Sequence, residues 1–87
     1  MVNMYVLVGS VTTAMRLKKL LEQRFAFSAD VVHTPSQIHH GDCSYSVRTD
    51  LRALPAVKSA VSEYGVGIRG MYDVKNVNGE RVFYAVS

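Results

Sequence analysis

The sequence predicts an α+β fold in which two helices cover one face of an antiparallel sheet. Strand-like and helix-like segments follow one another as strand, helix, strand, strand, helix, strand, and an Asn-Gly turn introduces one further strand. The chain has 87 residues and no low-complexity tract, so it is too short to divide its buried surface between two cores. We therefore expect one domain over residues 1–87.

The first strand is predicted over residues 4–8, which are apolar on both parities and rich in β-branched side chains. That pattern is typical of a central strand covered on both faces. The following helix is expected to be capped by Ser10, Thr12 or Thr13, whose hydroxyls accept from the first free N–H groups. Its apolar stripe has helical spacing over about four turns and comprises Ala14, Leu17, Leu21 and Phe25.

The second strand is predicted over residues 29–34 and ends before Pro35, which has no N–H for ladder pairing. Residues 35–42 are polar and contain proline, glycine and two adjacent histidines, so they form a loop of the kind that carries function. The third strand is expected to begin at Cys43. Its predicted buried face comprises Cys43, Tyr45 and Val47, and its outer face Ser44, Ser46 and Arg48.

The second helix is expected to start near Pro55, after a short turn at Thr49-Asp50. Gly65 is a left-handed stop for it. Its apolar stripe comprises Val57, Ala60, Val61 and Tyr64. Asn78-Gly79 then separates two β-type runs, which predicts a C-terminal β-hairpin arm over about residues 71–87.

This order of elements favours the ferredoxin-like arrangement, a split βαβ-βαβ in which two right-handed crossovers interleave. The third strand would lie antiparallel between the first two. The loop between the second and third strands would then emerge where the first helix begins, so Cys43 would face residues 9–13.

Charge and hydropathy exclude several classes of partner. The net charge of +3 is small, and the charged residues are scattered along the chain. The densest basic cluster lies on the predicted first helix and comprises Arg16, Lys18, Lys19 and Arg24. This position favours a solvated helix face over a nucleic-acid surface. The longest apolar run near the amino terminus falls far short of the roughly 20 residues that span a bilayer, so we expect no membrane partner and a cytoplasmic location. One cysteine agrees with a reducing compartment.

The single thiol of Cys43 is the candidate reactive group. A thiol with a pKa of about 8.5 needs a shift of about 1.5 units, roughly 2 kcal/mol, to be half ionised at neutral pH, and a helix N-terminus can supply that. A protonated His39 or His40 would add to the shift, whereas Asp42 opposes it. Two alternatives stay open: a packed, inert cysteine, and metal capture by His39, His40 and Cys43.

Residues 35–48 resemble the small family described as putative selenium/sulfur carrier protein-like, over about residues 4–74. The resemblance implies a hydroxyl-rich strand-to-helix corner, a proline-plus-isoleucine loop, and one cysteine opening a strand that ends in arginine. The residues in those places are Ser10, Thr12, Thr13, Pro35, Ile38, Cys43 and Arg48. Ser44 stands where members usually have glycine; serine narrows a partner's approach and adds a hydroxyl that can bond a sulfur anion.

The expected function is therefore a sulfur or selenium carrier, a relay rather than a turnover enzyme, with Cys43 holding the chalcogen and no metal or organic cofactor. Ser10, Thr12, Thr13 and Ser44 would bind the anionic cargo, and His39, His40, Gly41 and Arg48 would dock partners. Those partners are a sulfur or selenium donor protein and an acceptor protein. The edge strand of the hairpin also favours a homodimer. The alternative function is a non-catalytic binding or regulatory module in which Cys43 packs.

Overall fold

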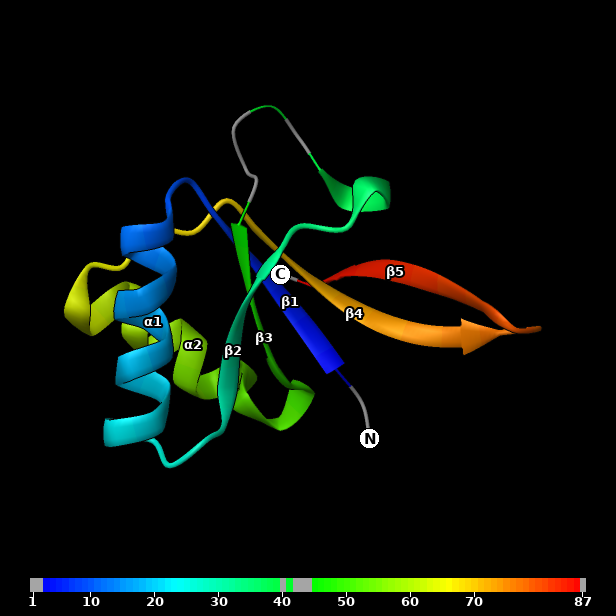
Figure 1. Cartoon of the computed structure of the whole chain (residues 1–87). Helices are drawn as coiled ribbons and strands as arrows, with labels where there is room; N and C mark the ends of the chain where they lie inside the picture. Colours follow the sequence, from blue (N-terminus) through cyan, green and yellow to red (C-terminus); the bar gives the residue numbers. More distant parts are fainter. Residues whose placement is uncertain (1–2, 40, 42–44, 87) are drawn as a thin grey trace.

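The computed structural model describes residues 3–39, 41 and 45–86, which form two α-helices and one five-stranded antiparallel sheet (Figure 1). The predicted α+β class is confirmed. The sheet order is β2-β3-β1-β4-β5. The elements in chain order are β1 (Asn3–Val8), α1 (Val11–Arg24), β2 (Ala29–His33), the 3₁₀ turn η1 (Ser36–Ile38), β3 (Tyr45–Asp50), the 3₁₀ turn η2 (Leu51–Ala53), α2 (Leu54–Tyr64), β4 (Gly70–Val77) and β5 (Glu80–Val86).

Both helices pack on the same face of the sheet, and Figure 1 shows them side by side there. Their apolar stripes meet the side chains of one parity of β1, because alternate residues of a strand face the same side. The fully buried members include Met4, Val6 and Val8 from β1, Ala14, Leu17 and Leu21 from α1, and Val57 and Ala60 from α2. This cluster is the main core.

The opposite face of the sheet has a smaller core of its own. Tyr5 and Leu7 point to that side and pack with Ile38 of η1, which is only 3% exposed. The expectation that the first strand is covered on both faces is therefore confirmed. One consequence overturns a prediction: Ser46, assigned to an outer face of the third strand, is fully buried, because it lies opposite Leu7 on this second covered face.

The helix ends follow local chemistry. Ser10 is the N-cap of α1, and its side chain accepts from the backbone N–H of Thr13. Gly65 ends α2 with φ of 67°, as the sequence predicts. At the end of α1 the same left-handed conformation falls on Ala26, with φ of 57°, where the sequence offers no glycine.

The C-terminal hairpin is confirmed, with Asn78 and Gly79 at φ of 52° and 83° in its turn. Such positive φ values at both positions match the twist of the flanking strands. The register of β4 with β1 ends at Val74, whereas its register with β5 continues to Val77. The tip of the hairpin therefore projects beyond the rest of the sheet, as Figure 1 shows.

The basic side chains of α1 make contacts within the chain. Arg16 donates to the backbone carbonyl of Tyr64 at the end of α2, and the Arg24 guanidinium lies 6.0 Å from the centre of the Tyr64 ring. Lys18 pairs with Glu22 one turn along, at 2.8 Å. Arg16, Lys19 and Arg24 are nevertheless exposed, as expected for a solvated helix face. Within residues 3–39, 41 and 45–86, neither helix has the length and apolar character needed to cross a membrane.

Candidate functional site

The sheet register brings the start of β3 to the corner where α1 begins. Tyr45, the first residue of β3, lies opposite Val8, the last residue of β1, and also opposite His33 of β2. The His33 and Tyr45 rings lie 5.2 Å apart, centre to centre. Since Val8 leads through Gly9 directly into the N-cap of α1, the chain enters β3 at the end of the sheet where α1 starts.

The corner carries the three hydroxyl side chains that the sequence singles out. The hydroxyls of Ser10 and Thr13 lie 3.0 Å apart and share a hydrogen bond, and Thr13 N–H donates to Ser10 Oγ at 3.2 Å. Thr12 is exposed beside them. The first turn of α1 contains no acidic residue. The partial positive charge of a helix N-terminus is therefore not offset here by a carboxylate of that turn.

Cys43, which the sequence predicts to be the reactive residue, lies outside the described part of the chain. Cys43, Ser44 and His40 are among the residues whose structure is not described, as is Asp42. Of the other loop residues, His39 is exposed and Gly41 is exposed with φ of 56°. The described residues contain no cluster of potential metal ligands. That observation does not bear on metal capture by His39, His40 and Cys43, because two of these three lie outside the described residues.

The loop between β2 and β3 is held at its described ends by two buried contacts. The hydroxyls of Thr34, directly after β2, and Ser46, near the start of β3, lie 2.7 Å apart and are both buried. Between them in sequence, Ile38 of η1 packs against Tyr5 and Leu7 on the second face of the sheet. The alternating pattern of residues 43–48 did not predict the Thr34–Ser46 contact.

Arg69 is a further cation at this corner that sequence patterns missed. Its backbone N–H donates to the carbonyl of Leu7 at 2.7 Å, which brings the residue beside the end of β1. A Cβ added to Gly9 would lie 2.9 Å from Arg69 Nη2, closer than such contacts normally allow. Gly9 thus permits the guanidinium to approach the backbone that leads into α1. No local sequence pattern signals this approach, because it depends on the contact between Arg69 and Leu7.

Arg48 lies elsewhere, toward the opposite end of the sheet. It is three residues along β3 from Tyr45, about 10 Å at the usual rise of a strand. It faces Asp30 on β2, with Nη2 3.3 Å from Oδ2. The structure therefore does not bring Arg48 together with Ser10, Thr12 and Thr13.

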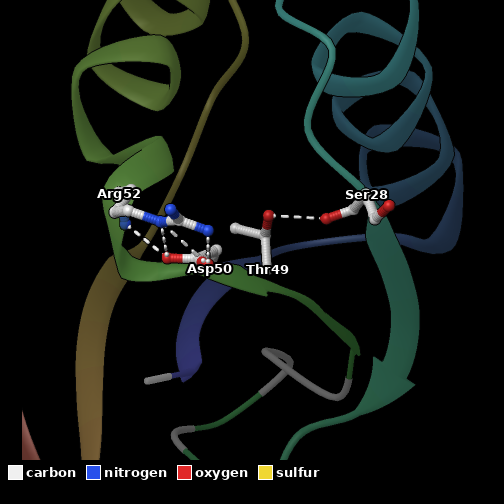
Figure 2. Close-up of polar contacts among 4 residues, drawn as sticks. All are labelled: Ser28, Thr49, Asp50 and Arg52. Carbon is white, nitrogen blue, oxygen red and sulfur yellow. Dashed lines mark hydrogen bonds and ion pairs between the residues drawn. The ribbon is translucent and has the colours of Figure 1, made fainter. Parts of the chain in front are cut away.

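Around Arg48 the surface is hollowed into a groove of about 790 Å³ at the end of β3. Figure 2 shows its polar contacts: the Arg52 guanidinium donates hydrogen bonds to the carboxylate of Asp50, and the hydroxyl of Thr49 donates to the Ser28 carbonyl at 2.8 Å. The lining residues are Ala26, Phe27, Ser28, Asp30, Arg48, Thr49, Asp50 and Arg52.

The charges of this groove pair with one another. The side-chain hydrogen bonds of Arg52, together with its backbone N–H, lower the pKa of Asp50, and the Asp50 carboxylate in turn raises the pKa of Arg52. Arg48 and Asp30 form the second pair. Asp50 also caps η2, because its carboxylate accepts from the Arg52 N–H at 2.8 Å. We therefore interpret these charges as stabilising the turn between β3 and α2, and not as an anion-binding site.

Together these features define a class of protein, a small α+β domain in which the loop between β2 and β3 lies near the start of α1. Buried contacts fix the described ends of that loop. The chain belongs to the family described as putative Se/S carrier protein-like, whose model matches residues 3–73. The match stops within β4, so β5 lies beyond it. No curated protein and no solved structure matches the chain.

Proposed function

We propose that this protein is a small sulfur or selenium carrier that holds one chalcogen atom on Cys43. Membership of the Se/S carrier-like family is the observation that carries the proposal. Cys43 is the sole cysteine of the sequence, so any thiol chemistry of the chain depends on it. The sheet order β2-β3-β1-β4, with both helices on one face, supports a ferredoxin-like scaffold for the carrier.

The transfer is an exchange that needs no external oxidant. The Cys43 thiolate attacks the terminal sulfur of a persulfide on the donor, a bond forms between Cys43 Sγ and that sulfur, and the donor's S–S bond breaks. The donor leaves as a thiolate, and Cys43 becomes a persulfide. An acceptor thiolate then attacks the terminal sulfur and releases Cys43 as a thiolate. A selenosulfide cargo follows the same steps with selenium as the transferred atom.

The corner at the start of α1 supplies the electrostatic support for an anionic cargo. The α1 N-terminus has no acidic residue in its first turn. Its partial positive charge favours a thiolate or persulfide anion over the neutral form. Ser10 and Thr12 are both exposed, and the hydrogen bond between Ser10 and Thr13 uses only one of their two O–H donors, so this corner keeps hydroxyls for cargo contact. Ser44 is the further hydroxyl that we assign to the cargo.

Partner docking is assigned to the loop that carries the thiol. His39 and Gly41 are exposed, as a surface that donor and acceptor share requires. His40 belongs to the same proposed surface. Arg48, held by Asp30 near the other end of β3, would meet only a partner that extends over the edge of the sheet.

The test is the intact mass of reduced protein after incubation with a cysteine desulfurase and cysteine. We expect one added sulfur atom on the native chain and none on Cys43→Ser. Thr12→Val should lower the loaded fraction several-fold, whereas Ser62→Ala, an exposed hydroxyl on α2, should leave it unchanged. Equal sulfur on native and Cys43→Ser protein would refute the carrier.

A binding module with a packed cysteine gives a different result in a second measurement. If Cys43 reacts with an alkylating reagent only in denaturant, the thiol is buried and the carrier proposal fails. Fast alkylation at neutral pH, with a thiolate pKa below about 7.5, supports the carrier. Stoichiometric zinc in untagged protein would instead support metal capture by His39, His40 and Cys43.

A further inference from the structure

The outer edge of β5 is the exposed end of the sheet. Among the described residues β5 pairs only with β4, so one side of this seven-residue strand has no ladder partner. The other end of the sheet is β2, which has five residues and is followed within two residues by Pro35. Short strands and nearby prolines protect sheet edges from pairing, and β5 has neither device.

Apolar side chains line both faces of this edge. Tyr84, on the helix side, is 46% exposed. On the other side, Phe83 lies opposite Val74, and its ring meets the Tyr5 ring edge-on at 5.8 Å. The charged residues of β5 are confined to its first two positions, Glu80 and Arg81. The rest of the strand is suited to burial against another strand.

We propose that β5 pairs antiparallel with β5 of a second copy of this chain and so joins two sheets into one. A two-fold axis perpendicular to the sheet keeps the helices of both copies on one side, and residues that face each other then have the same parity. Only one such register pairs all seven residues of β5. It sets Phe83 opposite Phe83 of the second copy, Val82 opposite Tyr84, Arg81 opposite Ala85 and Glu80 opposite Val86.

This register also places a cation beside each aromatic ring at the centre of the interface. The Arg81 guanidinium lies 5.5 Å from the centre of the Phe83 ring in its own strand. In the paired sheet each Arg81 is also the diagonal neighbour of the second copy's Phe83, so two cations flank two aromatic rings. No like charges face each other. The row from Val74 through Phe83 continues into the same row of the second copy, which extends the smaller core across the interface.

The interface is small, so the association is expected to depend on concentration. Standard interfaces use roughly 20–30 residues per partner, and a seven-residue strand with its neighbours supplies far fewer. We expect a dissociation constant on the order of tens to hundreds of micromolar, in the range of weak transient complexes. The dimer does not rest on the carrier function, because β5 lies beyond the residues that the family model matches.

The first test measures mass against concentration by sedimentation equilibrium, from about 5 μM to about 1 mM. The native chain should change from monomer to dimer over this range of concentration. Tyr84→Lys should raise the concentration at which half of the chains are dimeric at least tenfold. Met15→Lys is the matched control, because Met15 is 54% exposed on α1 and receives the same charge away from β5. A native chain that stays monomeric at about 1 mM, or equal shifts by both variants, overturns the proposal.

The second test fixes the register by cross-linking. On a Cys43→Ser background, Phe83→Cys should give a covalent dimer with oxidised glutathione, since the two substituted residues face each other. Glu80→Cys should not, because the two copies of that position lie about 20 Å apart in this register. Circular dichroism checks that each variant is folded. Cross-linking of Glu80→Cys but not of Phe83→Cys would overturn the register.

Discussion

The buried hydroxyl pair of Thr34 and Ser46 should behave as a coupled unit. Its oxygens lie 2.7 Å apart; Ser46 is fully buried and Thr34 is 8% exposed. Ser46→Ala or Thr34→Val removes one partner and leaves the other hydroxyl buried without it. Such an orphaned group destabilises a fold by roughly 1–3 kcal/mol. Thr34→Val keeps the shape of the side chain, so its effect reports the lost hydrogen bond.

The double variant should lose far less free energy of unfolding than the sum of the losses in the two single variants, because it leaves no buried hydroxyl without a partner. We expect a coupling free energy of about 1–2 kcal/mol in a double-mutant cycle. The free energy of unfolding is measured by urea denaturation and checked by thermal unfolding. Each single variant should lower Tm by roughly 4–8 °C per kcal/mol in a domain of this size.

Ser62→Ala, on the exposed face of α2, is the control and should change the free energy of unfolding by less than about 0.5 kcal/mol. If the two single effects add to within about 0.3–0.5 kcal/mol, the hydroxyls do not interact in the folded chain and the reasoning is refuted. A double variant as unstable as that sum would also mean that Ser46 is buried for a reason other than its contact with Thr34.

Three further predictions concern the ends of the elements. Hydrogen bonds from Arg52 lower the pKa of Asp50, so the stability that they contribute is present above the unfolded pKa of about 3.9 and is lost as pH falls through the folded pKa. The urea midpoint of the native chain should therefore drop more steeply below about pH 4 than that of Arg52→Ala. Parallel curves of urea midpoint against pH for the two proteins would contradict this. Ala26→Gly should raise stability by up to about 1 kcal/mol and Gly65→Ala should lower it by a similar amount, since both positions have φ near +60°; urea midpoints that move in the same direction would count against this. Ile38→Ala should cost about 2–4 kcal/mol in urea unfolding by emptying a site that is 3% exposed, and a loss below about 1 kcal/mol would show that η1 does not hold the loop.

Much of the fold could be predicted because local chemistry and final structure agree. The residues of β1 are apolar on both parities, and both faces of that strand are covered. Asn78-Gly79 supplies two residues that adopt positive φ readily, and the hairpin turns there. Ser10 is the N-cap among three hydroxyl candidates. In each case residues at the position itself indicate the conformation or environment that the structure shows.

Other features depend on residues that are distant in sequence. Ser46 alternates with apolar residues and so was assigned to an outer face, yet a 3₁₀ turn with Ile38 packs on that side of the sheet. Ala26 takes a left-handed helix end without a glycine, where the Phe27 N–H bonds the Leu21 carbonyl at 2.9 Å. The position of Arg69 at the corner follows from sheet pairing, which no local pattern encodes.

The approach of the loop between β2 and β3 to the start of α1 was predictable, whereas the position of Arg48 was not. The topology expected from the order of elements brings the end of the loop to the start of α1, and the register of Val8 with Tyr45 does so. Arg48 was assigned to partner docking from its place in a resemblance, and it lies along β3 in a pair with Asp30. Residues that share a motif in sequence need not share a site when they lie on one extended strand, because each adds about 3.3 Å of separation.

The contacts that stabilise the loop are distinct from the groups assigned to its chemistry. Thr34, Ile38 and Ser46 are buried and hold the described ends of the loop, whereas Thr12 and His39 are exposed. A carrier binds a donor and then an acceptor, so the surface that contacts these partners has to bind and release each of them while the sheet stays folded. Substitutions at the buried anchors should therefore change stability and loading together, while Thr12→Val should change loading with little effect on unfolding. This difference allows a loss of cargo caused by unfolding to be told apart from one caused by a weakened anion site.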